Sequence, residues 1–200
     1  MKELKHQLPP PKGRCPLAAV IMESYNKPNI NKAWAMPNSK TFSVKPINDL
    51  ILRYVRGVVV DPFANDNKIA TITNDINPSC DTTCHMEATE FLKMLDDECA
   101  DVVLYDPPYS PRQVSECYKE FGLTVNMKTT QASYWSKQKK EIARILKPGG
   151  VCITCAWNSN GIGKKYGFEQ IEILMVAHGG WHNDTIVTVE RKINSHGRTQ

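Results

Sequence analysis

Apolar positions fall into two alternating patterns along the chain, and together they predict strands and helices in turn. Stretches without clean polar alternation indicate strands buried on both faces; they occur at residues 57–63, 68–75, 101–109 and 150–158. Apolar residues spaced three and four apart indicate helices at 47–55, 85–95 and 132–150. Asn48 or Asp49 is expected to cap the first helix, and Pro-Gly-Gly to end the third. Two closing strands are expected at 168–180 and 184–192, the second of them antiparallel.

This order predicts an α/β fold of the Rossmann-like kind, with a mostly parallel sheet, helices on both faces and an antiparallel last strand. In such sheets, ligands bind beyond the carboxyl ends of the strands. Asp61, Asp75 and Asp106 each stand at or just after the end of a predicted strand. We therefore expect the three acids to share one cleft.

Residues 1–40 are rich in Pro, Asn and Lys and show no sustained period, so a loosely structured N-terminal arm is expected there. Residues 41–200 are enough for a single domain. The chain has no run of about 18 apolar residues, so no transmembrane helix is expected. The short apolar segment 16–22 follows four basic residues, but it lacks a small-residue cleavage site, so a signal peptide is not expected.

The net charge of +4 is unevenly distributed along the sequence. Residues 61–110 contain two Lys/Arg and eleven Asp/Glu, whereas residues 1–60 contain ten and three, and residues 111–200 contain thirteen and seven. The basic excess is weak evidence for a polyanionic partner. The acidic segment coincides with the three strand-end acids.

Seven cysteines occur at irregular spacing. Cys152 and Cys155 form the sequence's C-x-x-C, but residues three apart in a strand point to opposite faces, which suits one metal poorly. Cys80, Cys84 and His85 lack a second ligand pair at zinc spacing. Reduced thiols, no bound metal and a cytoplasmic location are expected.

The segment Asp106-Pro107-Pro108-Tyr109, at the end of a predicted strand, resembles the signature of the class I S-adenosylmethionine-dependent methyltransferases that modify exocyclic amino groups of nucleic-acid bases. Four further segments are similar to this family: "TFSVKPINDLI" (41–51), "VVVDPFAND" (58–66), "ITND" (72–75) and "ILKPGG" (145–150). The resemblance extends over about residues 41–192 and implies the class I methyltransferase fold.

The resemblance also implies site residues, with S-adenosylmethionine as the cofactor. The implied cofactor-binding residues are Thr41, Phe42, Ser43, Lys45, Asp61, Pro62, Phe63, Asn74 and Asp75. The implied catalytic residues are Asp106, Pro107, Pro108 and Tyr109. Substrate contacts are expected from Ser110, Arg112, Gln113, Trp157 and Asn158, the last two at the end of a strand where packing is an equal alternative.

The chemistry of amino methylation explains this signature. An exocyclic amine is a weak nucleophile, so the enzyme must hold it with hydrogen-bond acceptors within about 3 Å of its two N–H groups. The Asp106 carboxylate can be one acceptor and the Pro107 carbonyl the other, because consecutive prolines fix the loop. The Tyr109 ring can stack on the base, which stabilises an unpaired base by about 1–3 kcal/mol. The alternative is that this segment is only a strand-to-loop turn.

The sequence departs from the family pattern in two places. After Asp61-Pro62-Phe63, family members have glycines and a helix, whereas here "ANDNK" leads to the next predicted strand. Either the helix is absent and the cofactor pocket is shallower, or the second strand is misplaced. The chain also leaves no room for a separate target-recognition domain, so residues 1–40, or a lid formed by 110–131, are its expected substitutes. Weak sequence specificity, a homodimer or a single-stranded substrate would fit this size.

The expected function is methyl transfer to the N6 amine of adenine in DNA, and compact phage-encoded adenine methyltransferases are the nearest resemblance. RNA adenine and N4 of cytosine are alternative substrates. A degenerate fold that binds nucleic acid or protein without turnover is a second hypothesis, and methylation of a small-molecule or protein amine is a third. The basic residues Lys137, Lys139, Lys140 and Arg144 are expected to form a solvated helix face, and His178 and His182 to be structural or surface groups.

Overall fold

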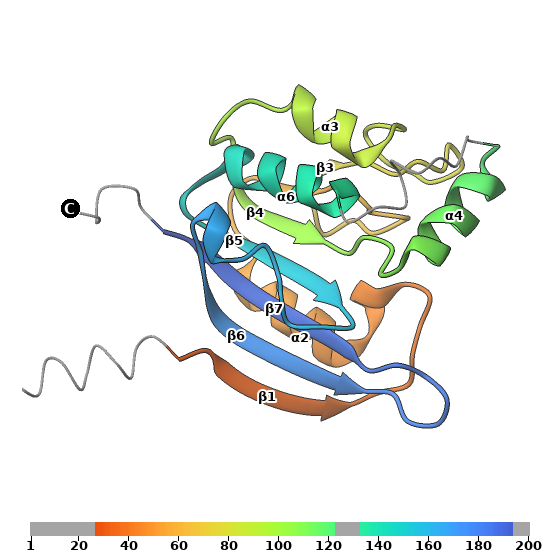
Figure 1. Cartoon of the computed structure of the whole chain (residues 1–200), viewed down its shortest axis with the longest axis vertical. Helices are drawn as coiled ribbons and strands as arrows, with labels where there is room; N and C mark the ends of the chain where they lie inside the picture. The colour runs from red at the N-terminus through yellow and green to blue at the C-terminus, as the bar shows by residue number, and fades with distance from the viewer. Residues whose placement is uncertain (1–26, 123–132, 194–200) are drawn as a thin grey trace, which may run out of the picture.

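The structure, a computed structural model, describes residues 27–122 and 133–193, and these residues form one seven-stranded sheet with helices on both faces (Figure 1). The sheet order is β1-β6-β7-β5-β4-β2-β3. The strands are β1 (Asn29–Trp34), β2 (Val59–Asp61), β3 (Ile72–Thr73), β4 (Ala100–Tyr105), β5 (Leu146–Ala156), β6 (Phe168–Ala177) and β7 (Thr185–Lys192). Adjacent strands are parallel except at β7, which runs antiparallel to both β5 and β6. The expected fold class and the antiparallel last strand are confirmed.

The helices are α2 (Lys45–Tyr54), α3 (Ala88–Met94), α4 (Pro111–Glu120) and α6 (Ser133–Ile145), with short 3-10 turns η1 (Thr41–Ser43) and η2 (Lys164–Tyr166). Successive residues of β4 explain the layering, because side chains alternate across a strand. Val102 and Leu104 pack into the core shared with α2, whereas Val103 and Tyr105 pack into the core shared with α3 and α6. None of the helices formed by the described residues is long and apolar enough to cross a membrane.

Helix α2 begins earlier than the sequence predicts. Its N-cap is Val44, whose side chain makes no capping hydrogen bond, and a proline lies in the first turn. Asn48 instead donates to the Phe42 carbonyl (3.1 Å), and Asp49 pairs with Lys45 (2.9 Å). The expected cap at Asn48 or Asp49 is therefore wrong, because the fixed φ of proline favours the first turn of a helix and so starts it earlier.

The expected third helix ends before its Pro-Gly-Gly stop. Helix α6 ends at Ile145, and β5 begins at once, with Leu146 opposite Ala100 and Val151 opposite Val102. The Lys-Pro-Gly-Gly segment is an irregularity in the ladder, and Gly149 in it has a φ of +77°. Pro-Gly-Gly thus forms a bulge at the start of the strand.

Strand β1 lies in the segment expected to be loosely structured, so that expectation is wrong for residues 29–34. The strand pairs in parallel with β6 at the sheet edge, and most of its side chains are exposed. Buried Glu172, on β6, connects β1 to α2, because it accepts hydrogen bonds from Asn31 of β1 (3.0 Å) and from Arg53 (2.7 Å) and Tyr54 (2.7 Å) of α2. An edge strand held by backbone and polar contacts has no apolar alternation to reveal it. Residues 1–26 lie outside the described residues.

The connection from β2 to β3 contains no helix. Residues 62–71 form turns, and β3 pairs in parallel with β2, with Val60 opposite Ile72 and Asp61 opposite Thr73. Of the two explanations for "ANDNK", a misplaced second strand is wrong, because β3 lies within the expected segment, although it is only two residues long. The absence of a helix between β2 and β3 is confirmed, and the shallower pocket stays a prediction.

Candidate active site

A cleft of about 930 Å³ opens at the carboxyl ends of β2 and β4. From β2 the chain continues to β3 on one side, whereas β4 lies on the other side of β2, so this is the point where the strand order reverses. Ligands of open α/β sheets bind at such points. The walls of the cleft are residues 38–43, residues 63–69, Asp75 and the loop 106–109. The Asp106 signature therefore lies in the pocket that the fold itself predicts.

The signature loop is fixed by hydrogen bonds from three directions. The Tyr109 hydroxyl donates to Asp106 Oδ1 (2.5 Å), and the Tyr109 backbone N–H donates to Gln113 Oε1 (2.6 Å). The indole N–H of Trp135, on α6, donates to the Pro108 carbonyl (3.0 Å). The Tyr109 ring meets Trp157 edge-on, with centroids 5.6 Å apart. The loop is thus rigid, and one carboxylate oxygen of Asp106 already has a partner.

Asp106 is half-buried beside the cleft, and its pKa reflects this position. Burial raises the pKa of Asp106 to about 6, and hydrogen bonds from Tyr109 and Thr41 oppose the rise. Burial also raises the pKa of the Tyr109 hydroxyl, and the nearby Asp106 charge adds to this effect. Tyr109 is therefore a neutral donor, and Asp106 is an acceptor that ionises near pH 6.

Asp61 shapes the cleft from behind and is not part of its lining. It is fully buried, and its Oδ1 accepts the Phe63 N–H (3.0 Å), which fixes the turn after β2. Its Oδ2 has no partner among the described residues. Burial raises its pKa strongly, and the carboxylates of Asp106 and Asp75 add to this rise. Pro62 also stays behind the lining, whereas Phe63 lines the cleft.

The loop that replaces the missing helix is held by asparagine and aspartate contacts. Asn65 has a φ of +50°, in the left-handed region that favours glycine. Its N–H donates to Asp75 Oδ2 (2.8 Å), and the Ala64 N–H donates to the Asn74 carbonyl (2.9 Å). Asparagine tolerates this backbone region better than most residues. Its position directly after D-P-F-A was the signal in the sequence that could have identified the turn.

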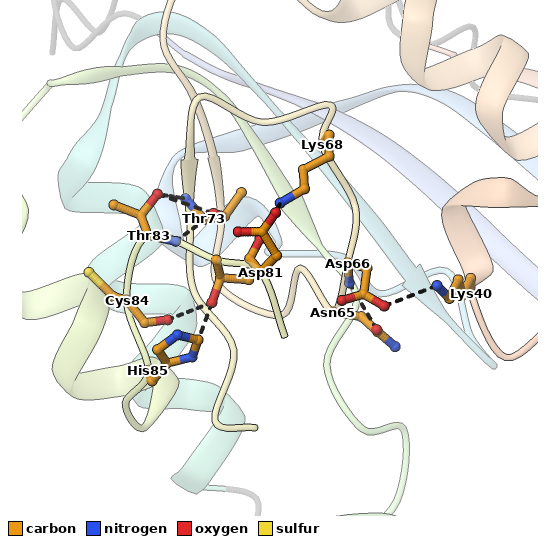
Figure 2. Close-up of polar contacts among 10 residues, drawn as sticks. Lys40, Asn65, Asp66, Lys68, Thr73, Asp81, Thr83, Cys84 and His85 are labelled. Atoms are coloured by element: carbon orange, nitrogen blue, oxygen red, sulfur yellow. Dashed lines mark hydrogen bonds and ion pairs between the residues drawn. The ribbon is translucent and has the colours of Figure 1, made fainter. Parts of the chain in front are cut away.

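Two lysines flank this loop. Figure 2 shows Lys40 reaching Asp66 (3.1 Å) and Lys68 paired with Asp81 (2.5 Å). Lys40 and Asp66 come from opposite walls of the cleft, so the ion pair joins the segment before η1 to the loop after β2. Sequence reasoning did not single out either lysine.

Asn74 and Asp75, the two candidates for ribose binding, have different environments. The Asn74 amide is buried and donates to the carbonyls of Pro62 (3.1 Å) and Met86 (3.0 Å), while its oxygen accepts the Met86 N–H (3.1 Å). Asp75 lines the cleft. Asn74 thus stabilises the loops, and Asp75 is the one of the two that lines the cleft.

The predicted cofactor-binding residues of η1 and the start of α2 also differ in whether they line the cleft. Thr41, Phe42 and Ser43 line the cleft. The Lys45 side chain is 84% exposed, is paired with Asp49 and is not part of the lining. The structure therefore brings the η1 residues to the site but leaves Lys45 outside it.

The five predicted substrate-binding residues also differ in whether they reach the cleft. Ser110 is the N-cap of α4, accepting the Gln113 N–H (3.3 Å), and Gln113 lines the cleft. Arg112 is exposed on α4 and paired with Glu116 (2.7 Å). Trp157 and Asn158 follow β5; Trp157 contacts Tyr109, whereas Asn158 turns to the Asn160 N–H (3.0 Å). The predicted lid is a helix in its first half, and residues 123–131 lie outside the described residues.

Two of the basic residues of α6, Arg144 and Lys139, make contacts within the fold. Arg144 pairs with Asp97 (2.6 Å) and Glu141 (2.7 Å) and donates to the carbonyls of Leu92 and Leu95, so it joins α6 to α3. Lys139 donates to the Gly161 carbonyl. This part of the predicted solvated face is therefore a packing surface.

Comparison with protein-family models and with curated protein sequences finds no match. Among solved structures, the chain is similar to 1,6-didemethyltoxoflavin-N1-methyltransferase of Burkholderia thailandensis, crystallised with 1,6-didemethyltoxoflavin and S-adenosylhomocysteine, at 11% identity over 68% of this chain and 71% of that one (TM-score 0.48). TrmN of Thermus thermophilus is similar at 15% identity over 75% and 49% (TM-score 0.48). A protein of Thermus thermophilus proposed to be a DNA modification methylase is similar at 15% identity over 56% and 53% (TM-score 0.36). These are similarities of fold at low identity.

Proposed function

We propose that this protein transfers a methyl group from S-adenosylmethionine to the N6 amine of adenine in DNA. The observation that supports the proposal is the Asp106–Tyr109 loop, which is held by hydrogen bonds and lines the cleft at the point where the strand order reverses. A strand-to-loop turn without a chemical role would not need a half-buried carboxylate with a raised pKa at the wall of a cleft.

The cleft fits S-adenosylmethionine in size and charge. Its volume of about 930 Å³ lies at the upper end of the usual range for pockets that hold small molecules. Asp66, Asp75 and Asp106 line it, and these acids favour a ligand with a sulfonium and an ammonium group. No helix N-terminus lies at the loop, and Lys40 and Lys68 are the lysines of the lining; to attract the cofactor's carboxylate, each would exchange its ion pair with Asp66 or Asp81. The bound cofactor would supply the electrophilic methyl group.

The residues of the loop have separate roles in the proposal. One oxygen of Asp106 holds the Tyr109 hydroxyl, and the carboxylate also accepts from Thr41; a carboxylate has about four acceptor sites, so it can still accept one N–H of the amine. The Pro107 carbonyl accepts the second N–H, because the Pro108 carbonyl is held by Trp135. The amine is thereby oriented for attack on the methyl group, and its proton is lost after transfer. Tyr109 supplies the aromatic ring beside the base.

Adenine in DNA is preferred because an aspartate begins the motif, which resembles the adenine-N6 branch of the family. RNA adenine and N4 of cytosine are alternative acceptors with the same amine chemistry. A binding protein without turnover is the second candidate function, and one observation favours it: the glycine-and-helix element that usually faces the cofactor is replaced by the turn at residues 62–71.

A transfer assay tests the proposal. Purified protein is incubated with labelled S-adenosylmethionine and unmethylated DNA or RNA, and the digested nucleosides are resolved by mass spectrometry. We expect N6-methyladenine from the wild type and at least a 100-fold lower rate from Asp106→Ala. Asp97→Ala is the matched control, because Asp97 is exposed and bound to Arg144 far from the cleft; it should retain full activity.

Methyladenine formed equally by wild type and Asp106→Ala would remove Asp106 from the mechanism. Formation of N4-methylcytosine or of a methylated RNA base would contradict adenine in DNA as the substrate but support amino methylation as the reaction. Absence of any methylated base, together with absence of cofactor binding, would contradict the enzyme and leave the binding protein.

A further inference from the structure

Tryptophan side chains gather at the carboxyl end of the sheet. The chain has four tryptophans, and all four lie there: Trp34 ends β1, Trp157 follows β5, Trp181 follows β6, and Trp135 holds the signature loop. Trp181 is fully exposed, Trp34 is 66% exposed and Trp157 is 41% exposed. Figure 1 shows that the ends of β1, β5 and β6 and the β6–β7 turn lie on the same side of the molecule as α4. Exposed tryptophans so close to the candidate site need a function.

A second pocket of about 340 Å³ lies between these tryptophans and the signature loop. Trp157, Trp181 and Tyr109 line it, together with polar side chains of Asn38, Gln113, His182 and Asn183. It shares Asn38, Thr41, Tyr109 and Gln113 with the larger cleft, so a ligand in one pocket reaches the wall of the other.

The β6–β7 turn that presents Trp181 is anchored. The buried His178 ring bonds to the Ala35 carbonyl (2.8 Å) and to Thr185 Oγ1 (2.8 Å), which confirms its expected structural role. Gly179 follows at a φ of +69°, and a Cβ there would come within 3.5 Å of the Trp34 indole nitrogen. The turn is thus held in place at its base, while the Trp181 ring extends into solvent.

We propose that Trp157 and Trp181 form a stacking surface for unpaired bases, and that the substrate is therefore a single-stranded nucleic acid. Trp34 extends this surface beyond the turn. The proposal rests on the proposed function, and it names the form of the nucleic acid that this site takes.

Three observations favour unpaired bases as the occupant. First, the surface is continuous with the cleft that holds Asp106. Second, none of the residues lining the second pocket is acidic, whereas three acids and two lysines line the cleft; the acidic excess favours the cationic cofactor in the cleft, and the second pocket does not repel a polyanionic strand. Third, exposed aromatic rings with amide groups around them can bind any base by its face and its edge, and a pocket of this volume admits a single base rather than a duplex.

A binding experiment tests this proposal independently of turnover. The probe is a 12-nucleotide single-stranded DNA of mixed sequence, followed by fluorescence anisotropy at fixed salt, with the same sequence as a duplex for comparison. We expect the single strand to bind at least tenfold tighter than the duplex. Trp181→Ala should weaken binding by about 5- to 100-fold, which corresponds to the stacking of one base, and Trp181→Phe should stay within about threefold of wild type. Leu52→Ala removes an exposed apolar side chain of α2 and should change nothing.

The outcomes separate this proposal from the enzyme. Loss of strand binding in Trp181→Ala without any methyl transfer by wild type would support the surface and overturn the enzyme. Methyl transfer by wild type with unchanged strand binding in both Trp181→Ala and Trp157→Ala would overturn the surface and keep the enzyme. Tighter binding of the duplex would overturn the single-stranded substrate. Because Trp181 is fully exposed, circular dichroism of its variants should match wild type, so a loss of binding reports the contact itself.

Discussion

At the scale of a single side chain, two opposing effects set the pKa of Asp106. Burial disfavours its charge, and hydrogen bonds from Tyr109 and Thr41 favour it, which leaves its pKa at about 6. Only the ionised form offers both oxygens as acceptors. We expect kcat/KM for methyl transfer to fall about tenfold per pH unit below pH 6 and to be level from pH 7 to 8, as measured by initial rates. A level profile down to pH 5 would contradict this role of Asp106.

The same raised pKa predicts the effect of Asp106 on stability. A carboxyl whose pKa is higher in the folded state than in the unfolded state stabilises the fold below about pH 4, and this contribution is lost as the pH rises through 6. Asp106→Asn keeps an oxygen for the Tyr109 hydroxyl and removes the buried charge. We expect it to be more stable than wild type by about 1–3 kcal/mol at pH 7 in urea unfolding, with a smaller difference at pH 4. Equal destabilisation at both pH values would indicate a structural role for the carboxylate.

At the scale of the element, the turn after β2 depends on the backbone of Asn65. Both Asn65→Gly and Asn65→Ala remove the side-chain oxygen that accepts the Asp66 N–H (2.8 Å), so their difference isolates the positive φ. We expect Asn65→Ala to be less stable than Asn65→Gly by about 1 kcal/mol in urea unfolding. Equal stabilities would show that the turn does not hold this conformation in solution.

Strand β1 depends on one buried carboxylate. Burial alone would raise the pKa of Glu172, but hydrogen bonds from Arg53, Tyr54 and Asn31 leave it lowered, so this contribution to stability is present above about pH 4.5 and lost as the pH falls further. We expect Glu172→Gln to cost about 1–3 kcal/mol and to speed hydrogen exchange of the β1 amides, because Arg53 loses its partner. Glu169→Gln is the control: Glu169 lies on β6, as Glu172 does, and its substitution should leave the hydrogen exchange of the β1 amides unchanged.

At the scale of the whole molecule, the sequence predicts those features that depend on local patterns. The apolar strands of the mostly parallel sheet and the position of Asp106 at the end of one of them follow from runs of residues such as 101–109. Strand β1 does not, because its polar residues are held by Glu172, 141 positions away from Asn31. The shared pocket of Trp157 and Trp181 cannot be predicted from local patterns either, since the packing of β5, β7 and β6 brings the two side chains to it. Asn74 and Asp75 looked alike in sequence, and only burial separates their roles.

The central claim is that the acid-lined cleft holds S-adenosylmethionine, and calorimetric titration with S-adenosylhomocysteine tests it most directly. We predict one site per chain for the wild type and at least tenfold weaker binding by Asp75→Asn, which neutralises an acid of the cleft. Asp97→Asn makes the same chemical change at an exposed position outside the cleft and should bind as wild type does. A titration without heat and without any shift in melting temperature, or equal affinity in the Asp75 variant, would contradict the account.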